Sequence, residues 1–266
     1  MVEDVVAAID EGLHAAGNPM RAVSEKRYLK SDLEFLGVGV PAMRAVAKAM
    51  RKQHPGLDHQ SLIDVVASLW AMPVYERRGV AIELLDLYHR LLLPEDVLLI
   101  ERLLRESRTW ALVDPLAIDC MGVLIQRYPE ITASLDRWST DADFWIRRSA
   151  MLALLLPLRK GDGDFKRFGR YADAMLEEKE FFIRKAIGWV LREAGRAQPD
   201  TCYGWLMPHA HRASGVTVRE AVKYLRPDQR EAVLAAYRLR TRPFDEIVLA
   251  SADSATVSGV ELVKEQ

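Results

Sequence analysis

The chain has 266 residues, of which 50% are apolar and 28% are charged, as in an ordinary globular protein. At roughly 100–200 residues per domain, this length allows one large domain or two small ones. Two cysteines exclude a disulfide framework and a four-cysteine zinc site, and a formal net charge of -1 excludes a uniformly basic coat for nucleic acid.

Apolar residues recur at helical spacing along most of the chain. The clearest stripes are Val5, Ile9 and Leu13, then Leu62, Val65, Val66 and Leu69, and then Val97, Ile100, Leu103 and Leu104. Clusters of proline and glycine separate the helical segments, and no convincing strand alternation precedes residue 240. We therefore predict an all-α chain.

Three stretches, 60–90, 95–128 and 141–177, each have about the 35–45 residues of a HEAT-like helix pair. A compact bundle is the alternative, but we favour a curved α-solenoid of HEAT-like helix pairs, an α-α superhelix with a concave binding face. We assign residues 1–240 to this single domain. Residues 241–266 change in composition, and we predict a tail without assigned function, with a short extended piece at 247–250.

The longest apolar run, residues 150–158, is too short to cross a bilayer and lies between Arg148 and Arg159. The acidic N-terminus lacks the pattern of a signal peptide. We therefore expect no membrane partner and a location in the bacterial cytoplasm, at the nucleoid. We also expect a monomer.

The charge is distributed unevenly along the chain. Residues 1–136 carry a net charge of -5, residues 137–240 carry +7 and residues 241–266 carry -3. A cationic face formed by residues 137–240 would attract a polyanion and release counterions. The alternative is that this excess lies within ordinary scatter.

The predicted helix over residues 181–194 has two different faces. Its core stripe contains Phe182, Ala186 and Val190, and its other face carries, at spacings of four and three, Lys185, Trp189 and Arg192. Gly188 makes the helix about 1 kcal/mol less stable than Ala would at this position. A glycine at this position therefore indicates that another group approaches the helix closely there. An aromatic ring flanked by cations suits a nucleotide, and the alternative is a Trp that covers a neighbouring helix while the cations snorkel.

Arg148 falls on the apolar side of the predicted helix over residues 143–156. A cation at such a position needs a partner, because burying it alone is unfavourable. One interpretation is an internal salt bridge to Asp114, Asp119 or Asp141. The other is a guanidinium that contacts a phosphate.

Trp110 and Asp114 are four residues apart, so one turn of helix places them on the same face. Asp114 also precedes Pro115, and an Asp-Pro pair is typical of a helix start with Asp as the N-cap. Spacing alone favours the cap. Tyr28 lies among lysines and arginines, a pattern found both in nucleic-acid contacts and in solvated surfaces.

His209 and His211 are not accompanied by a third metal ligand at a suitable spacing. We predict that both histidines lie in a loop and that the protein binds no metal. Cys120 and Cys202 are expected to be core thiols. No phosphate-binding loop or nucleophile motif is present, and we expect no cofactor.

Several stretches together resemble the AlkD-type DNA alkylation repair glycosylases, which are built from HEAT-like repeats. The most specific stretch is Phe-Phe-Ile-Arg-Lys-Ala-Ile-Gly-Trp-Val-Leu-Arg-Glu at residues 181–193, and others are 27–30, 109–114 and 145–150. The resemblance covers most of residues 5–240. It implies that the concave face binds duplex DNA containing alkylated bases.

The resemblance also assigns roles to particular residues. It implies that Asp114 is the catalytic carboxylate, that Trp110 and Trp189 flank the deoxyribose of the lesion, and that Tyr28 forms a wall of the site. The residues expected to bind DNA are Arg148, Lys185 and Arg192, with Arg159 or Lys160 in place of a lysine that the family has where Leu156 stands here. Where the family often has two adjacent tryptophans, this chain has Thr109 and Trp110.

The implied reaction is hydrolysis of the N-glycosidic bond of 3-methyladenine or 7-methylguanine by a monofunctional DNA glycosylase. A cationic alkylated base is a good leaving group and needs no general acid. A carboxylate and two indoles would stabilise the positive charge that develops on the sugar. The alternatives are a helical-repeat protein that binds DNA without catalysis and a scaffold that binds protein.

Overall fold

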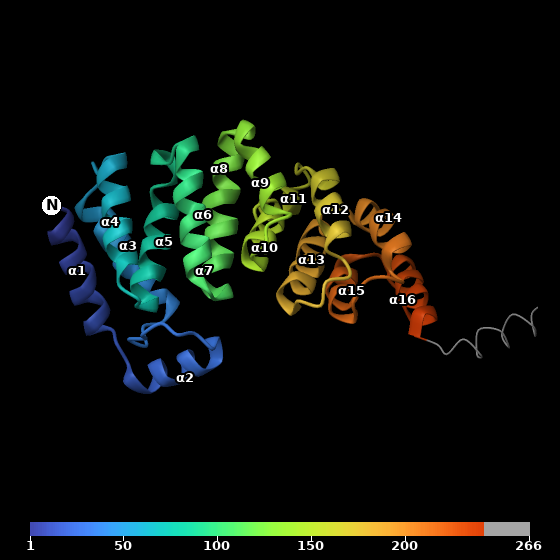
Figure 1. The fold of residues 1–266 in the computed structure, drawn as a ribbon, viewed down its shortest axis with the longest axis horizontal. Helices are drawn as coiled ribbons and strands as arrows, with labels where there is room; N and C mark the ends of the chain where they lie inside the picture. Colours follow the sequence, from blue (N-terminus) through green and yellow to red (C-terminus); the bar gives the residue numbers. More distant parts are fainter. Residues whose placement is uncertain (242–266) are drawn as a thin grey trace, which may run out of the picture.

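The computed structural model describes residues 1–241, and within them the chain is all-helical, as predicted. Paired helices stand side by side in a bent row that runs from α1 to α16 (Figure 1). The prediction of an α-solenoid is confirmed. The predicted tail, apart from Thr241, and its extended piece at 247–250 lie outside the described residues.

One set of helices packs in an unbroken series and carries the candidate site; we call it the site row. It consists of α3 (Val40–Gln53), α5 (Tyr75–Leu87), α7 (Trp110–Pro115), the π-helical segment η3 (Leu116–Met121), α8 (Gly122–Arg127), α10 (Phe144–Leu152), α11 (Leu155–Lys160), α13 (Phe181–Ala194) and α15 (Gly215–Ala221). Because every member packs against at least one other member, side chains from distant parts of the sequence meet on one surface.

The remaining helices alternate with the site row along the chain and cover its other side. They are α1 (Val2–Ala15), α4 (His59–Ala71), α6 (Val97–Ser107), α9 (Ala133–Trp138), α12 (Phe165–Ala174) and α14 (Pro199–His209). Two helices lie apart from this alternation, α2 (Pro19–Leu29) and α16 (Pro227–Thr241). Short 3-10 turns complete the described chain: η1 (His89–Leu91), η2 (Pro94–Asp96), η4 (Pro129–Thr132) and η5 (Val222–Tyr224).

Several helices begin at a residue whose side chain caps the first turn. Asn18 accepts a hydrogen bond from the backbone of Arg21, and Pro19 follows it at the first helical position of α2. Asp143 and Glu180 cap α10 and α13 in the same way. The predicted apolar stripes are buried, and together with the rest of the row they form one continuous core. The starts of these capped helices and the core faces are therefore set by local chemistry.

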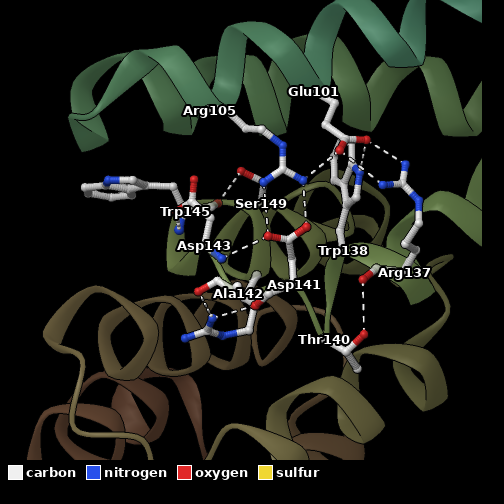
Figure 2. A network of polar contacts seen from close by, with 11 residues as sticks. Glu101, Arg105, Arg137, Trp138, Thr140, Asp141, Ala142, Asp143, Trp145 and Ser149 are labelled. Carbon is white, nitrogen blue, oxygen red and sulfur yellow. Dashed lines mark hydrogen bonds and ion pairs between the residues drawn. The ribbon is translucent and has the colours of Figure 1, made fainter.

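A polar network fixes the start of α10, the helix that carries Arg148 (Figure 2). Glu101 on α6 accepts hydrogen bonds from Arg105 at 2.7 Å, Arg137 at 2.6 Å and the Trp138 indole at 2.8 Å. The hydrogen bond from Arg137, reinforced by those from Arg105 and Trp138, lowers the pKa of Glu101 to about 2 against the effect of burial. Arg105 also holds Asp141, which accepts from the backbone of the α10 cap at 2.9 Å.

Candidate functional site

A cavity of about 380 Å³ opens on the site row, and we call it the aromatic cavity. Its walls come from α2, α7, α10 and α13, and its lining residues are Tyr28, Trp110, Asp114, Arg148, Phe181, Phe182, Lys185, Trp189 and Arg192. The structure therefore brings together every predicted site residue except Arg159 and Lys160. The cavity combines one carboxylate, aromatic rings and cations.

Asp114 lies inside α7, and Thr109 occupies the N-cap position of that helix. The interpretation of Asp114 as a helix cap is therefore wrong. Pro115 does not start a new helix, because the chain continues through η3 into α8 as one helix. Proline lacks the N–H that an α-helix would use and crowds the preceding turn. The wider π-helical turn begins directly after it, at Leu116.

Arg148 holds the carboxylate of Asp114 in a bidentate ion pair. Its Nε donates to Oδ1 at 2.8 Å and its Nη2 donates to Oδ2 at 2.9 Å. Its Nη1 donates to the backbone carbonyl of Phe182, and only 2% of the residue is exposed. The internal salt bridge is the interpretation that the structure supports. Three of the five guanidinium N–H groups are used in this way, and the phosphate contact of Arg148 stays a prediction.

Tyr28 reaches the cavity from α2 and meets Trp110 edge-on, with ring centroids 6.2 Å apart and an interplanar angle of 87°. Tyr28 is 73% exposed, so most of its ring is available to a ligand. Trp189 is half-buried on α13. These rings offer π faces to a cationic sugar or base.

Two phenylalanines that were not predicted as site residues belong to the wall of the cavity. Phe181 is 54% exposed and meets Phe182 edge-on at 5.5 Å. The prediction that Phe182 belongs to the core is wrong, because it is only partly buried and lines the cavity. A signal existed for Phe181, since it precedes Lys185 by four residues and therefore shares the face of Trp189.

Lys185 and Arg192 are neutralised from the neighbouring helix. Glu220 on α15 forms ion pairs with both, at 2.9 Å to Lys185. Burial, which favours the protonated acid, is outweighed by hydrogen bonds and charges from Lys185, Lys223 and Arg192, so the pKa of Glu220 falls to about 2. These cations line the cavity with their charge already partly balanced.

The close approach predicted at Gly188 is made by α15. A Cβ atom at this position would lie 2.8 Å from the Cβ of Glu220 and 2.8 Å from the carbonyl oxygen of Thr217. The glycine therefore lets α13 and α15 pack backbone to backbone and does not require a ligand.

Comparison with known proteins identifies the chain's relatives. A family model described as DNA alkylation repair enzyme matches residues 9–225. The chain belongs to this family. A solved structure of a predicted DNA alkylation repair enzyme from Enterococcus faecalis is 24% identical, with a TM-score of 0.70 over 79% of this chain and 97% of that one. A search of curated proteins finds no match.

Membership of the DNA alkylation repair family supports a role in the repair of alkylated DNA.

Two of the residues predicted to contact DNA lie away from the aromatic cavity. Arg159 forms an ion pair with Glu193 at 3.0 Å, and Lys160 lines a different cavity at the end of α11. Both follow Arg148 by more than two helical turns, which carries them along the row and away from Asp114. Their contact with DNA stays a prediction.

Within residues 1–241, no group of three His, Cys, Asp or Glu side chains has the geometry to hold a metal ion. No helix in the same range is long and apolar enough to cross a membrane.

His209 is the last residue of α14 and stacks on Trp205, with ring centroids 4.3 Å apart, so the prediction that His209 lies in a loop is wrong. Cys120 and Cys202 are buried, as predicted, and burial raises the pKa of Cys202 to about 12.

Proposed function

We propose that this protein is a monofunctional DNA glycosylase that hydrolyses the N-glycosidic bond of cationic alkylated purines in duplex DNA. The substrate class is 3-methyladenine and 7-methylguanine. The observation that carries the proposal is the meeting of Asp114, Trp110 and Trp189 in the aromatic cavity. Family membership supports the repair role, and this set of side chains supports the reaction.

The chemistry of the substrate explains why one carboxylate suffices. In a cationic alkylpurine the bond from C1′ to the base nitrogen breaks, and its electron pair neutralises the departing base. No acid has to protonate the leaving group. Positive charge then develops on the deoxyribose, as in glycoside hydrolysis. Water attacks C1′ and loses its proton, which completes the reaction.

Each part of the cavity has a task in this reaction. The carboxylate of Asp114 stabilises the cationic sugar and orients the attacking water. Trp110 and Trp189 place indole faces beside the same charge, which contributes about 0.5–2 kcal/mol per ring. Arg148 acts as a positioning residue, because its bidentate contact fixes both carboxylate oxygens relative to the cavity.

Release of 7-methylguanine from methylated duplex DNA, measured with excess enzyme, tests the proposal. We expect release by the wild type above the uncatalysed background. Asp114→Asn should lower the rate about 10²–10³-fold, the usual effect of removing one electrostatic group from a transition state. Asp64→Asn, an exposed carboxylate on α4, is the matched control and should keep the rate. Absence of release by the wild type would overturn the proposal.

A further inference from the structure

A second cavity on the site row is lined by several positively charged side chains and lies away from the aromatic cavity. It has a volume of about 590 Å³ and lies where η1, α8 and α11 end, and its lining residues are His89, Arg90, Val123, Gln126, Arg127, Leu156 and Lys160. We call Arg90, Arg127 and Lys160 the far cation cluster. No carboxylate is among the lining residues.

The far cation cluster lacks the neutralising partners of the cations in the aromatic cavity. Within residues 1–241, none of its members forms an ion pair with a carboxylate, whereas Lys185 and Arg192 both pair with Glu220. Arg127 is held by the carbonyl of His89 at 2.6 Å. Arg90 and Lys160 are exposed. Three cations without counter-charges create a positive potential that attracts an anion.

One helix links the two cavities. The chain runs through α7, η3 and α8 without a break, and its partly or fully exposed positions from Ala111 onward form a single stripe: Ala111, Pro115, Asp119, Val123, Gln126 and Arg127. Asp114 borders the aromatic cavity at one end of this stripe, and Arg127 borders the far cavity at the other. They are 13 residues apart, or about 20 Å at 1.5 Å per residue, which is comparable to the width of a DNA duplex.

The middle of the stripe is acidic. Asp119 lies in a hollow beside Glu83 and Asp86, with Arg44 and Lys48 on its rim, and Arg44 is already paired with Glu83 at 2.9 Å. A phosphate at this point would be repelled by the carboxylates, so the surface favours one backbone on either side and a groove between them.

We propose that the far cation cluster binds phosphates of the complementary strand while the strand with the lesion lies at the aromatic cavity. This inference rests on the proposed duplex substrate and adds the second strand to it. The protein would then distinguish a duplex from a single strand, because a single strand at the aromatic cavity would leave the far cation cluster without a phosphate to bind. Most of its affinity for the second strand is independent of base sequence.

Binding of fluorescently labelled DNA by Arg90→Ala/Lys160→Ala tests the inference without any base release. Both side chains are exposed, and circular dichroism checks the fold. We expect the variant to bind an unmodified duplex about ten- to hundredfold more weakly at 0.1 M salt. The slope of log K against log salt should fall by about 2, because two phosphate contacts are lost. Binding of the single strand with the same sequence should be unchanged.

Arg102→Ala/Lys166→Ala is the matched control, since it removes two exposed cations from covering helices α6 and α12. It should bind duplex as the wild type does. The inference is overturned if Arg90→Ala/Lys160→Ala keeps the wild-type duplex affinity and slope, if it loses single-strand affinity equally, or if the control loses as much. If the wild type releases no methylated base while Arg90→Ala/Lys160→Ala still binds duplex more weakly than the wild type, the proposed glycosylase activity is wrong and the second-strand contact stands.

Discussion

Arg148 and Asp114 face each other across two helices, and the guanidinium contacts both carboxylate oxygens at 2.8 and 2.9 Å. The pair is buried, with the side chains 3% and 12% exposed, yet it borders the aromatic cavity. An ion pair in this position holds the proposed catalytic carboxylate at a fixed place on a rigid scaffold. It also joins α7 to α10, so the site and the fold depend on the same contact.

Arg148→Met should therefore destabilise the protein strongly. Removing one partner leaves the Asp114 carboxylate buried without compensation, and we expect a loss of about 3–5 kcal/mol in the free energy of unfolding. The double variant Arg148→Met/Asp114→Asn should recover part of this loss, because no uncompensated charge remains. Urea unfolding of the wild type, both single variants and the double variant measures the coupling. Additive losses, equal within about 0.5 kcal/mol to the sum of the single effects, would contradict it.

The helices could be predicted from the sequence, because apolar stripes such as Val5, Ile9 and Leu13 mark the face of a helix that is buried. It was misleading at Asp114, where the local Asp-Pro signal for a cap was overridden by a continuous helix that widens after Pro115. The convergence of Tyr28 with Trp110 depends on how α2 packs. Sequence spacing within one helix cannot contain that information.

The electrostatic pairing of the site was equally inaccessible to sequence reasoning. Lys185 and Glu220 are 35 residues apart and meet only because α13 and α15 pack closely at Gly188. Helical spacing correctly placed Lys185, Trp189 and Arg192 on one face, and it could also have placed Phe181 there. Which charges are already neutralised is a property of the neighbouring helix, so it could not be read from that face alone.

Gly188→Ala should destabilise the protein although alanine is the better helix former. The new methyl group would meet Glu220 and Thr217 at 2.8 Å, and overpacking of this kind costs about 1–3 kcal/mol. Gly204→Ala on α14 is the matched control, because nothing lies within 4 Å of its Cβ position, and it should stabilise by about 0.5–1 kcal/mol. Thermal unfolding distinguishes them. Equal shifts in Tm would mean that α13 and α15 are not in close contact.

Glu220→Gln should strengthen the binding of duplex DNA. The substitution keeps the shape of the side chain and removes the carboxylate that Lys185 and Arg192 share. Arg192 keeps its ion pair with Glu193 at 3.1 Å, so Lys185 is the cation that is released. We expect about three- to tenfold tighter binding and a salt slope steeper by about 1, since an additional cation becomes free to meet a phosphate. Glu177→Gln makes the same charge change at an exposed residue after α12 and should have little effect. Weaker binding by Glu220→Gln would show that the carboxylate positions these cations more than it neutralises them.

Asp119 should make the protein more stable in mild acid than at neutral pH. Burial, together with the charges of Asp86 and Glu83, raises the pKa of Asp119 to about 6. Between its unfolded value of 3.8 and about 6, the folded state holds the proton more tightly, so stability declines as pH rises through this window. Asp119→Asn removes the titrating group and should be about 1–2 kcal/mol more stable than the wild type at pH 7, after allowance for partial exposure. The two proteins should converge near pH 4. Urea unfolding at intervals between pH 4 and 7 measures the difference, and parallel curves for the two proteins would exclude Asp119 as its source.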